Sequence, residues 1–505
     1  MKKITTTFFL TISSFFVFSQ SIDKSFCTKK MKKDLEVFKE IRIQANSGLY
    51  KYRTKKKTDS IYMWADKEIE RASTYLDFYN IICKLTDFEG SLHNHTDFPN
   101  KYWKYMQKES FGYFPYPIKW IEGKWRVNFQ NEEIPLDAEI VSINGNQIYE
   151  IVNNLYKYYT TDGENITGKR IGLRTHFSKY YRWDYGLKTN FNITFKKKNT
   201  NVEQTISLKG ISYSDYYKNF RHRHSKPYDE IYYTELEGSE KYNFTLVNRN
   251  TALLTIYSFT IGGNENSKQH KNYLSFLDSI FIEIKNKKIE NLILDVRHNG
   301  GGTDPNDLVT YSYLAQRNFQ ENKKAWISFN KIPLSKYYDT FIPKFIRPLI
   351  LPVYNKKIEN IFPIEKGGKY YQDKDSDDHK IRTPNKNAFE GNIYLLISPA
   401  VASAGSLFAS MLAGNKNTTT IGEETMGGYY GHNGHTSFSY KLPMSKILVT
   451  FSIVNLEQDV PKKTNQKYNR GIIPDHNIPQ TLKDFLNNED TQMNFTLKLI
   501  KKNHQ

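Results

Sequence analysis

Two apolar strands, each running through a turn into a helix, constrain the fold of this chain most. They lie in "NLILDVRHNGGG" (291–302) and "YLLISPAVASAGSLFASMLAGN" (394–415). Both strands are apolar enough to be buried on two faces, which is typical of a parallel sheet. A further strand, "TALLTIYSF" (251–259), and a helical pattern at 266–288 precede them. This alternation predicts an α/β domain with parallel βαβ units.

The segments before the α/β part follow other patterns. Apolar residues recur every three or four positions over residues 30–90, which predicts a helical N-terminal region. Further along, "AEIVSINGNQIYEIVNNL" (138–155) combines a strand, an Asn144-Gly145 turn and an amphipathic helix. This piece resembles part of a PDZ domain, with Asp137 at the usual acidic position. An ordinary hairpin followed by a helix is the alternative.

The length of 505 residues is too great for one hydrophobic core, so several domains are expected. The changes of pattern predict a signal peptide at 1–19, a helical N-terminal region at 20–104, a PDZ-like α+β domain at 105–210, a linker at 211–245, an α/β domain at 246–485 with an insertion at 318–390, and a C-terminal tail at 486–505.

The N-terminus predicts export. A basic start, "MKK", precedes the apolar stretch "ITTTFFLTISSFFVF", and Ser19 is a small residue suited to cleavage. The stretch is shorter than the roughly 20 apolar residues of a membrane-spanning helix, so we expect no stable membrane anchor after cleavage. The mature protein is expected in the periplasm, outside the cell, or associated with the envelope. There, Cys27 and Cys83 could either pair or stay free.

The formal net charge of +19 raises the question of a nucleic-acid partner. The lysines are scattered through polar surface segments, and no nucleic-acid-binding motif accompanies them. We therefore expect no nucleic-acid partner, although a basic surface favours acidic substrates in general. The sequence gives no indication of the oligomeric state.

Ser403 lies where the second of the two strands turns into a helix. At a helix N-terminus, unpaired backbone N–H groups and the positive end of the helix dipole stabilise a developing oxyanion. The same position suits an N-cap, which contributes about 1 kcal/mol to stability and no chemistry. Taken alone, the surrounding residues favour the cap.

The three glycines at 300–302 bear on whether Ser403 is an N-cap or a catalytic residue. Glycines let backbone amides approach a ligand closely, and open α/β sheets bind ligands beyond the carboxyl ends of their strands. If the two strands are neighbours, the N–H groups of Gly301, Gly302 and Ala404 can bind an oxyanion beside Ser403. A phosphate-binding loop is a weaker alternative, because no lysine follows at the required spacing.

Three ordered stretches carry a family resemblance: "LILDVRHNGGG", "YLLISPAVASAGSLFASMLAGN" and "TTTIGEETMGG". Together with the later "RGIIPDHNIP", they resemble the tail-specific, or C-terminal processing, serine peptidases, in their tricorn-like branch. The resemblance implies Ser403 as the nucleophile, with oxyanion donors from Ala404 and from Gly301 or Gly302. It also implies protein or peptide substrates and no cofactor or metal.

The resemblance does not identify the general base. The lysine of the serine–lysine branch falls here on Gly428, the strand histidine of the tricorn-like branch on Thr255 or Tyr257, and the late glutamate on Tyr468. Histidine suits base catalysis because its pKa lies near neutral pH. The candidates for the base, with the first-ranked first, are His432, His435 and His95, and Glu424 is a candidate for orienting the base or the substrate.

The sequence thus predicts an exported serine-type endopeptidase. The alternative is a catalytically inactive protein that keeps the fold and binds a peptide or other ligand, because the expected lysine and strand histidine are missing. Replacing Ser403 would distinguish these two functions.

Overall fold

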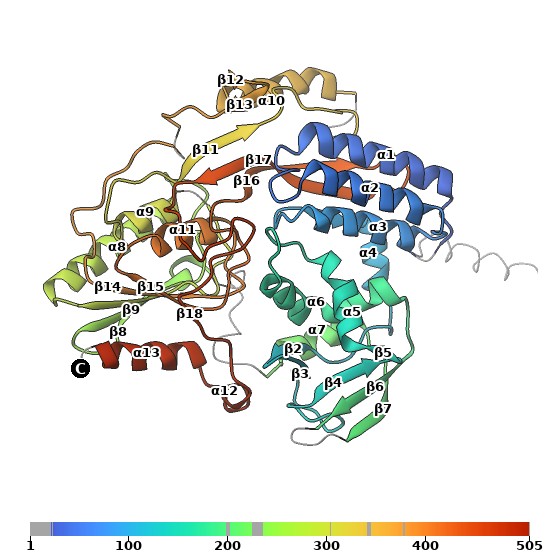
Figure 1. The fold of residues 1–505 in the computed structure, drawn as a ribbon, viewed down its shortest axis with the longest axis horizontal. Coiled ribbons are helices and arrows are strands. Elements are labelled where there is room, and N and C mark those ends of the chain that lie inside the picture. The colour runs from blue at the N-terminus through green and yellow to red at the C-terminus, as the bar shows by residue number, and fades with distance from the viewer. Residues whose placement is uncertain are drawn as a thin grey trace, which may run out of the picture.

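The computed structural model describes residues 22, 24–197, 202–224, 236–303, 305–340, 345–376 and 379–503. Its strands form three sheets of six strands each, with helices packed around them (Figure 1). The expected signal peptide at 1–19 lies outside the described residues. Among the helices that are described, none is long and apolar enough to cross a membrane.

The α/β unit is built on a sheet with the strand order β18-β15-β14-β10-β9-β8. Strands β9, β10, β14, β15 and β18 run parallel, and β8 pairs antiparallel with β9. The elements of this unit are β8 (Tyr242–Leu246), β9 (Thr251–Ile256), α8 (Lys268–Asn286), β10 (Asn291–Asp295), α9 (Asn306–Ser312), β14 (Asn392–Ile397), α11 (Ser403–Ala413), β15 (Thr418–Gly422), β18 (His476–Asn477), α12 (Leu482–Asn487) and α13 (Thr491–Asn503).

Both faces of this sheet are covered, as the apolar runs of β10 and β14 require. Leu292 and Leu294 pack in a core with α8, α9 and α11, whereas Ile293 packs in a smaller core with α13. Figure 1 shows α13 beneath the sheet and α8, α9 and α11 above it. Residues 486–505 were expected to form a tail. Most of them instead form a helix, because a parallel sheet needs cover on its second face.

A second sheet joins the N-terminal helices to the rest of the chain. Its order is β1-β17-β11-β13-β12, with β16 also paired to β17. Phe38 and Ile41 of α1 share one core with Val449 and Phe451 of β17, so the helical region packs on this sheet and does not form a core of its own. The elements here are α1 (Thr28–Ala45), α2 (Lys55–Ile69), α3 (Tyr75–Phe88), β1 (His95–Asp97), α4 (Asn100–Met106), β11 (Asn322–Ile327), α10 (Arg347–Ile361), β12 (Ile364–Lys366), β13 (Lys369–Tyr371), β16 (Asn433–Lys441) and β17 (Leu448–Gln458).

The third sheet has the order β2-β3-β4-β6-β7, with β5 paired to β4, and it packs against α5 and α6. Asn144 and Gly145 form the β4–β5 turn with φ angles of 50° and 81°. This unit contains β2 (Ile118–Ile121), β3 (Lys124–Val127), β4 (Glu139–Ile143), β5 (Asn146–Gln147), α5 (Ile148–Leu155), η1 (Tyr156–Tyr158), α6 (Thr167–Tyr185), β6 (Asn190–Lys196) and β7 (Glu203–Lys209).

The segment expected to be a linker, 211–245, is partly regular. It contains α7 (Tyr213–Arg221), η3 (Gly238–Lys241) and most of β8, while its residues 225–235 lie outside the described part. The two cysteines are not paired: Cys27 is exposed and Cys83 is buried in α3.

Candidate active site

Ser403 is the first residue of α11, and its backbone has a left-handed conformation with φ of 49°. This conformation costs a non-glycine residue about 1–2 kcal/mol, and such strain clusters at functional sites. The residue at the N-cap is Ala402, and no side chain caps the helix. The N-cap role of Ser403, which the surrounding residues favour, is therefore wrong. Its hydroxyl is available for another contact.

The glycine corner, residues 300–302, lies beside Ser403. Strands β10 and β14 are parallel neighbours, so the turns after them meet at one edge of the sheet. A Cβ atom at Gly301 would lie 2.8 Å from the Ser403 Cβ and 3.0 Å from the Ala404 nitrogen. Gly301 also has φ of 108°, a conformation that favours glycine. The absence of a side chain at Gly301 therefore allows this corner to pack directly against the start of α11.

The backbone N–H groups around Ser403 differ in their partners. Ala404 is the second residue of α11, so its N–H has no acceptor within the helix. The Gly301 N–H donates to Asn299 Oδ1 at 2.9 Å. Gly302 lies against the backbone of Phe259 in a parallel bridge. The Gly301 amide, one of the expected oxyanion donors, is thus already engaged by a side chain.

His93 is the residue that contacts the Ser403 hydroxyl. Its Nε2 lies 3.2 Å from Ser403 Oγ, although the two residues are 310 positions apart in the sequence. His93 occupies the turn directly before β1, which pairs with β17 through His95 and Thr450. His93 was not among the residues predicted for the site. Its only signal in the sequence is its place two residues before the predicted candidate His95 in "LHNHTDF".

Burial keeps the His93 ring neutral. Burial is the main cause that lowers the pKa of His93 to about 4; the neighbouring His95 and His435 act in the same direction, and the Asn433 backbone opposes them. The Nδ1 atom is buried, and the Asn433 backbone interacts with the ring in the direction that favours a bound proton. At neutral pH the ring is therefore uncharged, and an unprotonated Nε2 can accept the hydroxyl proton.

The three histidines that were candidates for the base do not contact the Ser403 hydroxyl in the described structure. The His432 ring is buried and lies against His93, with ring centroids 4.9 Å apart. His435 is exposed on β16. His95 is exposed on β1, beyond the turn that carries His93. Of the three, His432 is the one whose ring packs against the His93 ring.

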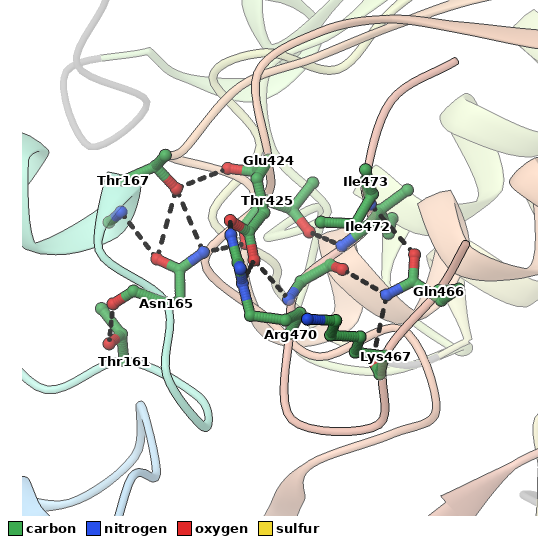
Figure 2. Close-up of polar contacts among 12 residues, drawn as sticks. Thr161, Asn165, Thr167, Glu424, Thr425, Gln466, Lys467, Arg470, Ile472 and Ile473 are labelled. Carbon is green, nitrogen blue, oxygen red and sulfur yellow. Dashed lines mark hydrogen bonds and ion pairs between the residues drawn. The ribbon is translucent and has the colours of Figure 1, made fainter. Parts of the chain in front are cut away.

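Glu424 has a different set of partners. Its carboxylate forms an ion pair with Arg470 and accepts the Gly471 N–H at 2.9 Å (Figure 2). The side chain is 5% exposed. These contacts fix the segment 470–473 against the end of β15, and in the described structure the Glu424 side chain contacts neither His93 nor Ser403. Its position is that of a structural carboxylate.

A cavity of about 250 Å³ lies between the third sheet and the α/β unit. Its walls come from β2, from α6 and from the turns after β10 and β14, including Ala400, three residues before Ser403. Lys119, Arg170 and Arg174 line it together with Glu423. No group of three or more His, Cys, Asp or Glu side chains among the described residues could hold a metal ion.

Comparison with known proteins relates the part of the chain that contains Ser403 to a family. Residues 250–478 match the family described as Peptidase family S41. The structure is similar to that of mature CPAF complexed with lactacystin, with 13% identity, a TM-score of 0.62, and coverage of 94% of this chain and 98% of that chain. It is also similar to the crystal structure of mature CPAF, with 12% identity, a TM-score of 0.56, and coverage of 90% and 94%.

At these identities the structural likeness establishes the fold alone. No curated protein matches the sequence. The family match covers the strand, glycine corner and helix that bring Gly301 and Ser403 together, which is the part of the chain where the resemblance to tail-specific peptidases was found. Residues 250–478 therefore form a region that matches peptidase family S41, and the protein is a serine-type peptidase.

Proposed function

We propose that the protein is an exported endopeptidase in which Ser403 is the nucleophile and His93 is the general base. The contact of 3.2 Å between Ser403 Oγ and His93 Nε2 carries this proposal. His93 takes the hydroxyl proton as Oγ bonds to the peptide carbonyl carbon, and returns it to the leaving amine as the C–N bond breaks. Water then hydrolyses the acyl-enzyme, again with His93 as the base.

His93 works without a carboxylate partner in contact with its ring among the described residues. The backbone of Asn433 and the ring of His432 support this proposal because they hold the His93 ring in place. Such a base is weak, since its pKa is about 4. We expect the oxyanion site to supply much of the rate enhancement in compensation.

The proposed oxyanion site combines the Ala404 N–H with the glycine corner. The Ala404 amide lies at the positive end of α11, next to the nucleophile. On the other side, the Gly301 or Gly302 amide is the second donor. A role for Gly301 requires its N–H to leave Asn299 Oδ1, so this hydrogen bond competes with the oxyanion in the free enzyme.

The cavity of about 250 Å³ is the proposed site for part of a peptide substrate. Strand β2 lies at the edge of the third sheet, where an extended peptide can add as a further strand beside α6. This arrangement supports the PDZ-like interpretation of residues 105–210 and the division of the chain into domains. The Arg170 guanidinium, stacked on Trp120 at 4.2 Å, favours acidic groups on the peptide.

The test is covalent labelling with a fluorophosphonate together with hydrolysis of a protein substrate. Ser403→Ala is expected to abolish labelling and to lower the rate of hydrolysis at least about 10³-fold, with unchanged thermal melting. Ser410→Ala is the matched control, because this serine is buried in the same helix and its hydroxyl has no described partner. Equal labelling of wild type and Ser403→Ala would show that Ser403 is not the nucleophile.

Two further assays address the finer parts of the proposal. Peptides with a free C-terminal carboxylate, compared with their amides, test the cavity, and an equal KM for both would count against it. Cleavage after Ser19 and recovery of the mature chain outside the cytoplasm test export.

A further inference from the structure

The segment 160–167 connects η1 to α6, and it contacts both the residues around the histidine turn and the residues that follow β15. It belongs to the unit of the third sheet, yet many of its hydrogen bonds go elsewhere. The Gly163 N–H donates to the Gly90 carbonyl at 2.8 Å, next to the turn that carries His93. Asn165 Nδ2 donates to the Thr425 carbonyl, and Thr167 Oγ1 to the Glu424 carbonyl, each at 2.9 Å (Figure 2).

This segment holds the residues on both sides of His93. Thr160 Oγ1 donates to the Asn94 carbonyl at 2.7 Å and lies 3.3 Å from the Leu92 carbonyl. The Leu92 N–H in turn donates to Asp162 Oδ1 at 3.0 Å. The histidine turn has no helix or long strand of its own, so these bonds are a main constraint on where the ring lies.

The second carboxylate oxygen of Asp162 reaches the other half of the site. Asp162 Oδ2 accepts the Gly428 N–H at 2.9 Å. Directly before Gly428, the N–H groups of Met426 and Gly427 donate to the Val401 carbonyl at 3.1 and 3.2 Å. Val401 lies two residues before Ser403. One carboxylate therefore ties the histidine turn to the segment that supports the nucleophile.

We propose that Asp162 is a positioning residue, whose carboxylate sets the distance between His93 and Ser403 by accepting the N–H groups of Leu92 and Gly428. The inference rests on the proposed roles of His93 and Ser403. Asp162 touches neither reacting atom, and it lies apart from the lining of the substrate cavity. Its loss is therefore expected to lower kcat and to leave KM nearly unchanged.

The surroundings of Asp162 make the arrangement sensitive to pH. Asp162 is 1% exposed, and burial raises its pKa to about 7, while the two N–H donors and Lys51 lower it. Lys51 is the charged group that faces it, the Tyr52 hydroxyl lies close by, and Arg53 binds the neighbouring Gly163 carbonyl. Protonation turns one acceptor oxygen into a donor, so the link weakens as the pH falls through about 7.

The experiment compares Asp162→Asn with wild type in steady-state hydrolysis at several pH values. The asparagine amide presents an NH2 group to one of the two N–H donors, so one link is lost. Because a displacement of about 1 Å at a reacting pair costs up to about 100-fold, kcat is expected to fall about 10- to 100-fold, with KM within about twofold. The wild-type decline of kcat between pH 8 and pH 6 should disappear in the variant.

Two controls keep the result interpretable. Asp87→Asn removes a carboxylate of α3 that pairs with Lys169 of α6. This side chain has no described contact with the histidine turn, so the kcat of the variant should match that of wild type. Thr160→Val removes the links to the carbonyls flanking His93 and should lower kcat in the same manner as Asp162→Asn. Thermal melting confirms that each variant is folded at the assay temperature.

The outcomes separate the inference from the proposed function. If Ser403→Ala loses activity and folded Asp162→Asn retains the wild-type kcat and pH profile, the positioning role is overturned and the catalytic pair stands. If Ser403→Ala retains activity, the proposed function fails first. A KM increase without a change in kcat would place Asp162 in substrate binding and overturn its positioning role.

Discussion

The two halves of the proposed active site are built in different ways. The nucleophile half consists of β10, the glycine corner, β14 and the start of α11, which form one parallel unit with a shared core. The histidine half is a turn before a strand of three residues, held by β17 and by the segment 160–167. One half is specified by regular local structure, and the other by contacts from distant parts of the chain. Changes to the two halves should therefore have different effects.

The sharpest test of this comparison is removal of the base. His93→Gln is expected to lower kcat about 10³-fold, because the neutral amide cannot accept the Ser403 proton. His432→Gln is the matched control. Its ring packs on His93 without contacting Ser403, so a loss of no more than about tenfold is expected. A reversed order of effects in steady-state kinetics would make His432 the base.

The nucleophile half is tested by Gly301→Ala. The added Cβ would lie 2.8 Å from the Ser403 Cβ, and φ of 108° strains any side chain, so a loss of activity of about 100-fold is expected. Gly145→Ala is the control: its φ is 81°, but no atom lies within 4 Å of its added Cβ, so hydrolysis should be unaffected. Full activity in Gly301→Ala would show that the glycine corner does not contribute to catalysis.

The pH profile of wild type examines the histidine half without a mutation. The pKa of His93 is lowered to about 4, so the neutral, active ring persists well below pH 6.5 and is lost as the pH falls through about 4. Acylation by a fluorophosphonate should therefore fall about tenfold for each pH unit below this value. A midpoint near 6.5 that persists in Asp162→Asn, in which the decline near pH 7 is expected to disappear, would contradict the burial of the ring in the working enzyme.

The smallest effect on catalysis is expected at Glu424. Replacement by Gln breaks the ion pair with Arg470 and weakens the hydrogen bond from Gly471, so the free energy of unfolding should fall by about 2 kcal/mol. The value of kcat should stay within about threefold, since Glu424 does not reach the reacting atoms. Urea unfolding and steady-state kinetics measure the two effects. Lost activity with unchanged stability would return Glu424 to the catalytic candidates.

The sequence predicted the half of the site that is built from regular local structure better than the half that is held by distant contacts. Ser403 and Gly301 were predicted to lie close together because parallel neighbouring strands place their C-terminal turns at one edge, and the structure has them in contact. The confirmed family resemblance rests on the same segment. The hydrogen-bond partners of individual amides were not predictable, as the engaged Gly301 N–H illustrates.

His93 could not be selected in this way. Nothing in "LHNHTDF" indicates that β1 begins at His95 and leaves His93 in a turn, because that boundary is set by pairing with β17. Glu424 was misleading for a related reason. Its sequence position next to the end of β15 is close to the site, but its side chain turns to Arg470, which arrives from a later segment. For Glu424, the sequence indicated the place of the residue near the site but not the direction in which its side chain points.

The separation of 310 positions between His93 and Ser403 has a consequence for the life of the enzyme. During synthesis the histidine turn emerges long before the nucleophile, and the strand that positions it, β17, emerges later still. An unfinished or unfolded polypeptide therefore has no competent base beside its serine. With the proposed catalytic pair, a protease built like this gains its activity only when the whole chain has folded.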